Sequence, residues 1–305
     1  MKCKIDNTVK LYDLVKMDDT LEVFNETKKI ISMIYENFEY ALFEKVYNDV
    51  IRLFRGEYPG YRGCNTDYHD LNHTLNTLLA TIRLIHGYSI KKERFHEHIV
   101  LIGLFAALFH DTGYIQKTGD KKGTGARYTL KHVDRSIKFA KNYLYQNKAT
   151  IDDIYACACM IKCTELTKNI DKIKFNSHDA MVIGKILGTA DSIGQMADRL
   201  YLEKLLFLFK EFNEGNIYKF INEFDLIKKT VSFYNFILDR WKKQLGGMNR
   251  FMVYHFKVRW GINEDLYQKA IDNNINYLKK IVNDVSENYL SYLKRGNISK
   301  KSIQI

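Results

Sequence analysis

Histidine and aspartate side chains occur in three short segments whose spacing suits metal binding. These segments contain His69 and His73, the adjacent pair His110-Asp111, and Asp191. A helix would place His69 and His73 on one face, because side chains four residues apart meet on a helix. Divalent metals that activate water take imidazole and carboxylate ligands that converge on one point. We therefore expect a buried metal site, although each segment alone would be read as ordinary helix surface or a helix end.

Two ions are expected rather than one. Asp111 lies beside the imidazole of His110 and has two oxygens, so it could bridge a pair of ions, while Asp191 could supply an oxygen from a distant helix. Two divalent ions about 4 Å apart can hold a bridging hydroxide and bind phosphoryl oxygens. The expected cofactor is thus a pair of divalent ions, Mn, Fe, Mg or Zn, and the expected chemistry is phosphoester hydrolysis.

Helices are the elements that must position these residues. The chain of 305 residues contains one proline, Pro59, and 17 glycines, and this scarcity of helix breakers favours long helices. Apolar residues recur at helical spacing over 19–55, 68–86, 93–110, 129–146, 151–163, 178–212, 217–242 and 262–294. The closest approach to a strand pattern is VYHFKVRW at 253–260. The prediction is an all-α bundle, with the most apolar helix ending at His110 and Gly113 as its stop signal.

The organisation expected is one helical domain with additions at both ends. No proline-rich or serine-rich linker divides the chain. We assign residues 1–64 to an N-terminal helical elaboration, 65–212 to the metal-binding core, and 213–305 to a helical extension packed on that core. The amphipathic stretch Tyr201–Phe212 is interpreted as a core or homodimer contact.

Composition narrows the class of protein. The net charge of +11 suits an anionic partner, but the lysines are scattered and no nucleic-acid-binding module is found, so a small anionic substrate is expected rather than nucleic acid. No apolar run is long enough for a membrane span, and no signal peptide is evident. An odd number of cysteines without such a signal favours reduced thiols and a cytoplasmic protein; they are Cys3, Cys64, Cys157, Cys159 and Cys163.

The ordered set of candidate ligands resembles the HD superfamily of metal-dependent phosphohydrolases. The segment YHDLNH, residues 68–73, is similar to the Tyr-His-Asn-x-x-His signature of its cyclic nucleotide phosphodiesterase branch. The segments IKCTELTKN (161–169) and GTADSIGQMADR (188–199) resemble two further helices of that branch, and the resemblance covers roughly residues 65–212.

The resemblance implies a role for each matching residue. His73, His110, Asp111 and Asp191 match metal ligands, with Asp111 bridging the ions. His132 falls where related enzymes have a histidine near the second metal. That histidine is either a ligand of the metal or a hydrogen-bond donor to one of its ligands. His69 matches the general acid that protonates the leaving oxygen. That role needs a protonated imidazole near neutral pH, which a neighbouring carboxylate would favour; Asp67, Asp70 and Glu165 are candidates.

Substrate contacts are less defined by the sequence. Thr164 and Glu165 match a Thr-Asp step of the family, and Gln195 shares a helix face with Asp191, where it could meet substrate or pack against a neighbouring helix. Lys122 and Arg127 belong to the glycine-rich loop GDKKGTGAR, which could close over an anionic substrate or serve as a solvated connector.

The departures from the family concern the substrate. Asp70 replaces the usual Asn, Glu165 replaces Asp, and only Gln244 with Phe251 loosely matches the glutamine and phenylalanine that hold a purine. A cyclic nucleotide phosphodiester is the expected substrate. The alternatives are another nucleotide phosphohydrolase, acting on a dNTP, a monophosphate or an alarmone, and a non-catalytic sensor of metal or nucleotide. Thr112-Gly113 after the His-Asp pair counts against the alarmone branch, which has an acidic pair there.

Overall fold

The computed structural model describes residues 9–284 and 288–298, and within them the chain is all-α, as predicted. The α-helices are α1 (Thr20–Ser32), α2 (Tyr40–Arg55), α3 (Leu71–Lys91), α4 (Glu97–Phe109), α5 (His132–Gln146), α6 (Ile151–Lys162), α7 (His178–Met196), α8 (Tyr201–Glu214), α9 (Glu223–Lys243), α10 (Met252–Trp260) and α11 (Leu266–Asp284). Short 3-10 helices connect them: η1 (Leu11–Asp13), η2 (Thr112–Tyr114), η3 (Gly125–Tyr128), η4 (Ile170–Lys172), η5 (Met248–Phe251), η6 (Tyr289–Ser291) and η7 (Arg295–Asn297).

The stretch with the closest approach to strand alternation, 253–260, is helical and forms most of α10. The stretch 178–212, expected as one long helix or two in tandem, is two helices, because the chain turns at residues 197–200 between α7 and α8. The helical path breaks between α9 and α10 at Gly246-Gly247, where both glycines have positive φ angles of 65° and 62°. Glycine adopts such a conformation without the steric cost that a Cβ brings.

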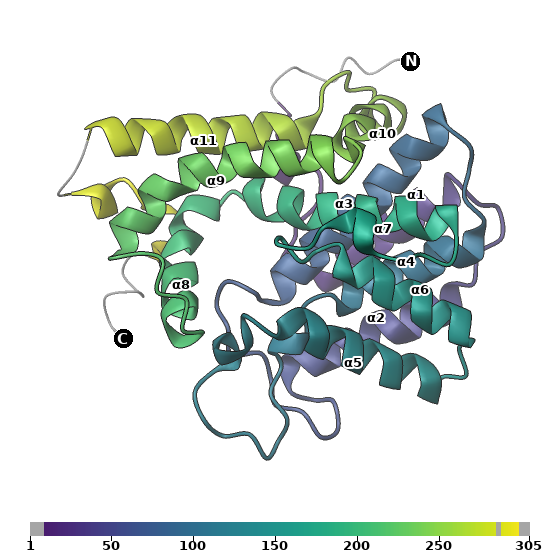
Figure 1. The fold of residues 1–305 in the computed structure, drawn as a ribbon. Helices are drawn as coiled ribbons and strands as arrows, with labels where there is room; N and C mark the ends of the chain where they lie inside the picture. The colour runs from purple at the N-terminus through teal and green to yellow at the C-terminus, as the bar shows by residue number, and fades with distance from the viewer. Residues whose placement is uncertain (1–8, 285–287, 299–305) are drawn as a thin grey trace.

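Helices α3, α4, α6 and α7 form the centre of the bundle (Figure 1). Helix α3 packs along α7 and α4, and α6 packs on both α4 and α7. Helix α4 is apolar on all faces, and its residues from Val100 to Phe109 are buried. A helix of this composition is stable only when other elements surround it, so α4 and the His-Asp pair at its end are held in the interior.

The C-terminal helices extend this bundle. Helix α11 runs beside α9, α9 packs on α8, and α10 lies against α3 (Figure 1). Buried apolar residues from Val15 to Leu293 form one hydrophobic cluster that draws on all three segments assigned from the sequence. No helix in the described part of the chain is long and apolar enough to cross a membrane.

The described cysteines carry free thiols: Cys64, Cys157, Cys159 and Cys163. Burial raises the pKa of Cys163 to about 12, so this thiol stays protonated and serves as a small apolar side chain. Cys3 lies outside the described residues.

Candidate metal centre

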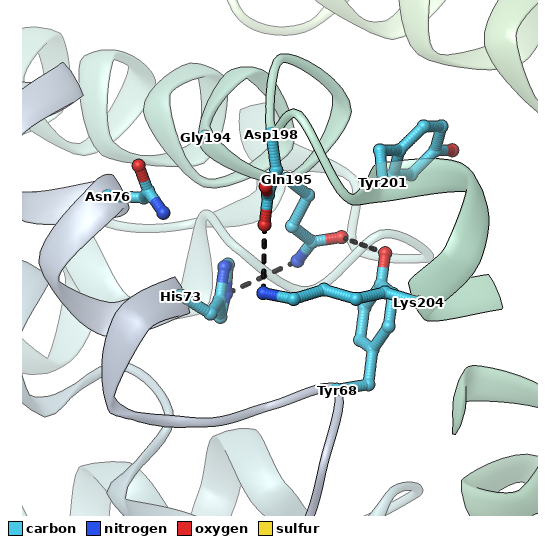
Figure 2. Close-up of a pocket in the computed structure, with 8 residues that line it drawn as sticks. All are labelled: Tyr68, His73, Asn76, Gly194, Gln195, Asp198, Tyr201 and Lys204. Carbon is cyan, nitrogen blue, oxygen red and sulfur yellow. Dashed lines mark hydrogen bonds and ion pairs between the residues drawn. The ribbon is translucent and has the colours of Figure 1, made fainter. Parts of the chain in front are cut away.

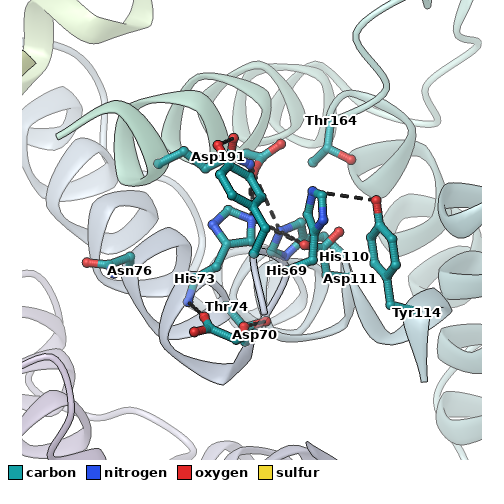
Figure 3. A network of polar contacts seen from close by, with 12 residues as sticks. His69, Asp70, His73, Thr74, Asn76, His110, Asp111, Tyr114, Thr164 and Asp191 are labelled. Atoms are coloured by element: carbon teal, nitrogen blue, oxygen red, sulfur yellow. Dashed lines mark hydrogen bonds and ion pairs between the residues drawn. The ribbon is translucent and has the colours of Figure 1, made fainter. Parts of the chain in front are cut away.

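Four of the expected ligands meet at one point inside the bundle (Figure 3). His73 comes from α3, His110 and Asp111 from the end of α4, and Asp191 from α7. The Nε2 atom of His73 lies 3.1 Å from Asp191 Oδ1, 3.2 Å from Asp111 Oδ2 and 3.1 Å from His110 Nε2. His73, His110 and Asp111 are all buried and form a group whose ligand atoms could hold a metal ion.

The polar atoms of this cluster are not satisfied by one another. Nε2 of His73 has one lone pair or one hydrogen, yet the amide nitrogen of Gln195 also lies 3.3 Å away, so four polar atoms surround it. Asp111 Oδ2 is buried and accepts no hydrogen bond of good geometry from the described residues. Buried polar groups are nearly always paired, and a cation among these atoms would satisfy them together. The donor set of imidazole and carboxylate therefore fits a divalent metal.

The end of α4 fixes the orientation of His110. Its Nδ1 lies 2.7 Å from the carbonyl oxygen of Ala107 and can only donate there, so the lone pair of a neutral ring sits on Nε2, facing His73. Gly113 follows in η2, where a Cβ would lie 1.9 Å from the carbonyl oxygen of His132. Gly113 is thus required by the close approach of α5 rather than as a helix stop, and this approach brings His132 beside Asp111.

His132 lies at the outer side of the same carboxylate. Its Nε2 is 3.7 Å from Asp111 Oδ1, and its Nδ1 donates to the carbonyl oxygen of Thr129 at 2.6 Å. Burial lowers the pKa of His132, and the nearby charge of Asp111 only partly offsets this effect. A neutral ring with its lone pair on Nε2 is the form that binds metal. Asp111 therefore presents Oδ2 to His73 and His110 and Oδ1 to His132.

The charges in the cluster are strongly coupled. Burial would lower the pKa of His73, but Asp111 and Asp191 outweigh it and raise that pKa to about 10. Burial would raise the pKa of Asp111, but His110 and His73 hold it well below its usual range. The carboxylates thus stay ionised in the interior and attract positive charge, whether protons or a metal cation.

His69 stands outside this cluster, and its expected place on a helix face with His73 is wrong. Helix α3 begins at Leu71, because Asp70 is its N-cap and accepts the backbone N–H of His73 at 2.8 Å. Aspartate is among the preferred N-cap residues, since it satisfies an N–H that has no partner within the helix. His69 therefore precedes the helix, and its ring centroid lies 5.9 Å from that of His73.

The partners of His69 come from distant parts of the chain. Its Nδ1 lies 2.6 Å from Glu211 Oε2, and Glu211 Oε1 also accepts the backbone N–H of Tyr68 at 2.7 Å. The ring stacks on Tyr114, with centroids 4.3 Å apart, and Nε2 lies 3.5 Å from the Tyr114 hydroxyl. The carboxylate that contacts His69 is thus Glu211 of α8, a residue that was not a candidate for this role from the sequence. Its only signal in the sequence is an acidic residue on the apolar side of α8.

Gln195 connects the cluster to Tyr68. Its side-chain amide donates to Asp191 Oδ1 at 3.1 Å, and its oxygen accepts the hydroxyl of Tyr68 at the same distance. A pocket of about 10 Å³, room for roughly one water, lies behind His73 between Gln195 and Lys204 (Figure 2). Lys204 is paired with Asp198 at 2.8 Å, so its ammonium is already neutralised at the edge of this small pocket.

The cluster opens on its other side into a cavity of about 480 Å³. His69, Asp111, His132 and Asp191 line this cavity, together with the candidate substrate residues Thr164, Glu165 and Gln195.

The other candidate substrate residues do not line this cavity. Arg127 donates to Asp120 at 3.0 Å, and the carbonyl oxygen of Lys122 accepts a hydrogen bond from Gln116. Glu214 of α8 accepts two hydrogen bonds from Thr124, which anchor the loop. Gln244 and Phe251, the loose match to a purine clamp, also lie away from the cavity lining.

Comparison with known proteins identifies a family and no characterised relative. No curated protein and no solved structure matches the chain. A family model described as Npun_R2479-like matches residues 23–245, which is most of the chain and includes every residue of the metal cluster and its neighbours His69 and Glu211. The chain belongs to the Npun_R2479-like family.

Proposed function

We propose that this protein is a metal-dependent phosphohydrolase of the HD type that cleaves a phosphoester bond. His73, His110 and Asp111 would hold one divalent ion, with an oxygen of Asp191 completing its protein ligands. His132 and the second oxygen of Asp111 would hold another. Divalent ions at these positions, Mn, Fe, Mg or Zn, would polarise the phosphoryl oxygens and lower the pKa of a water molecule.

The observation that carries this proposal is the position of His69. It lies beside the ligand cluster but outside it, on the wall of the same cavity as Asp111. Glu211 accepts the Nδ1–H of His69 and fixes the ring, so that Nε2 points away from Glu211. A protonated His69 can then give its Nε2 hydrogen to the departing alkoxide, while Glu211 stabilises the positive charge of the ring. A purely structural metal site has no use for a proton donor at this place.

The resemblance makes a cyclic or other nucleotide the first substrate class to examine. We further propose a reducing, cytoplasmic setting, which the four free thiols of the described residues support.

The experiment that tests the function varies the leaving group. Full-length protein supplied with each metal in turn is assayed on phosphodiesters that release either p-nitrophenolate or an alkoxide. His69→Ala is expected to keep its metal and to lose about 10²–10⁴-fold in kcat/KM on alkoxide esters. The loss with p-nitrophenolate should be much smaller, because this leaving group departs without a proton.

His178→Ala is the matched control, since His178 is an exposed histidine on α7 away from the cavity. It should change neither reaction. Absence of turnover on every phosphoester with all four metals would overturn the proposed function, and an equal loss on both leaving groups would overturn the role of His69.

A further inference from the structure

Two helices of the C-terminal half build most of the cavity wall opposite the ligand cluster. Helix α8 contributes four side chains at one spacing, namely Tyr201, Leu205, Leu208 and Phe212. Helix α9 contributes Leu226, Thr230, Phe233 and Ile237 at the same spacing, with Lys229 beside them. Positions i, i+4, i+7 and i+11 lie on one face of a helix. Two largely apolar helix faces therefore line the cavity beside the contact between α8 and α9.

Four polar side chains that line the cavity are already engaged within the protein. Thr230 donates to the carbonyl oxygen of Leu226, and Thr164 donates to that of Ile161, both at 2.9 Å. Ser192 donates to the carbonyl oxygen of Thr189 and accepts the indole N–H of Trp241. Gln195 is bonded to Asp191 and Tyr68. These groups are thus less available to recognise a hydrogen-bonding edge such as that of a nucleobase. Away from the metal cluster, the other polar groups of the lining include the charged residues Asp134, Glu165, Lys219 and Lys229.

The mouth of the cavity continues this apolar character. Leu130 and Leu166 line it and are 73% and 40% exposed. Lys219 and Lys229 also line the cavity, and the ammonium of Lys229 is held by Asp225 at 2.8 Å. A ligand that covers apolar side chains at a concave surface removes them from water, and this burial favours binding. A volume of about 480 Å³ lies within the range of small-molecule sites.

We infer that the substrate is a phosphoester of a hydrophobic alcohol, whose alkyl, isoprenoid or aryl group fills the space between α8 and α9 while its phosphate meets the His-Asp cluster. This inference rests on the proposed function and names the substrate class for the same site. It assigns the apolar faces of α8 and α9 to substrate binding, so the C-terminal half sets specificity.

The test is a series of p-nitrophenyl alkyl phosphates, with ethyl, butyl, hexyl and octyl groups, given to the metal-loaded full-length protein. All members release the same leaving group, so differences report binding of the alkyl chain. Each methylene that enters the cavity should raise kcat/KM by about fourfold, the burial free energy of a CH₂ group, until the cavity is full. The p-nitrophenyl ester of thymidine 5′-phosphate, a nucleotide of comparable size, should be cleaved no faster than the ethyl ester.

Two variants of α9 sharpen this test. Phe233 lines the cavity, whereas Phe236 on the same helix is exposed and does not line it. Phe233→Gln should lower kcat/KM on the octyl ester about tenfold or more relative to that on the ethyl ester. Phe236→Gln should leave both unchanged. A flat chain-length series, or a preference for the thymidine ester, would overturn the inference while leaving the proposed function intact.

A binding measurement separates failure of the inference from failure of the function. If no ester is hydrolysed with any metal, the proposed function fails, and the thermal shift caused by octyl phosphate compared with ethyl phosphate still decides the ligand class. A larger stabilisation by octyl phosphate that Phe233→Gln removes would support the apolar subsite. Equal shifts for the two phosphates would overturn it.

Discussion

Helix α3 carries two buried histidines, and each contacts a second histidine with nearly the same geometry. Near its start, His73 Nε2 lies 3.1 Å from His110 Nε2, with ring centroids 5.1 Å apart and planes at 74°. Near its end, His86 Nδ1 lies 3.0 Å from His255 Nδ1, with centroids 5.1 Å apart and planes at 83°. What distinguishes them is the charge around each pair.

The first pair is surrounded by carboxylates and the second by guanidinium groups. Asp111 and Asp191 contact His73, whereas Arg83 and Arg259 are the charged neighbours of His255. Burial, followed by Arg259, lowers the pKa of His86 to about 4, and burial and Arg83 lower the pKa of His255. The second pair is thus held neutral, and no carboxylate among the described residues is in contact with it to attract a cation. Two imidazoles at contact distance are therefore no sign of a metal site, and the carboxylates make the difference.

Removing the shared carboxylate should have the largest effect. Asp111→Asn keeps the shape of the side chain but loses the charge that both proposed ions need. We expect kcat/KM on a phosphodiester to fall by about 10³-fold or more, because metal ions supply several kcal/mol of transition-state stabilisation. Asp239→Asn, at an exposed carboxylate of α9, is the control and should retain full activity. Normal turnover by Asp111→Asn would show that the carboxylate is not what distinguishes the first histidine pair from the second.

Protonation of the second histidine pair should affect how the free energy of unfolding depends on pH. His86 has a pKa of about 4 in the folded chain and about 6.5 when unfolded, so the unfolded state takes up a proton first. The contribution of His86 to the free energy of unfolding is therefore constant above about pH 6.5. It falls as the pH drops towards 4, by about 3 kcal/mol at most.

A His86→Gln variant removes this titration. Its free energy of unfolding, measured in urea at pH 7.5, 6 and 5, should fall less on acidification than that of the wild type, whatever its value at pH 7.5. Parallel curves for the two proteins would mean that His86 is not held neutral.

The smallest expected effect concerns the guanidinium beside the second pair. Arg83 is buried and donates to the Tyr267 hydroxyl, while its Nε and Nη2 have no hydrogen-bond partner among the described residues. Arg83→Met should remove the repulsion of a proton on His255, so acid unfolding should begin roughly half a pH unit lower. The acid midpoint measured by circular dichroism checks this, with Lys243→Met as an exposed control. An unchanged midpoint would assign the low pKa of His255 to burial alone.

The sequence was sufficient for the helical fold and for the residues that converge on His73. Helical periodicity and the scarcity of proline predicted the helices, and the residue types of His110, Asp111 and Asp191 predicted a shared ligand cluster. These features are local, because periodicity and ligand type can be read within one segment.

The position of His69 depends on which residue begins α3, and helical periodicity does not reveal that residue. The same apolar pattern allows α3 to begin at Tyr68 or at Leu71, and the side chain of Asp70 decides by capping the later start. Glu211 lies 142 residues from His69 in the chain, so only the closure of the bundle brings them together. The apolar stripe of α8 was evident in the sequence, and its interpretation as a core contact is confirmed, since Tyr201 and Leu205 are buried in the hydrophobic cluster and α8 packs on α9. The sequence did not show that part of this stripe also lines a cavity.

Metal content is the most direct test of the difference between the two histidine pairs. Full-length wild type, Asp111→Asn and His86→Gln are dialysed to equilibrium against Mn, Fe and Zn, and bound metal per chain is measured by mass spectrometry. We predict two divalent ions per chain in the wild type and in His86→Gln, and fewer than one in Asp111→Asn. Less than one ion per chain in the wild type under replete conditions, or full occupancy in Asp111→Asn, would contradict the assignment of the His73–His110–Asp111 cluster as the metal centre.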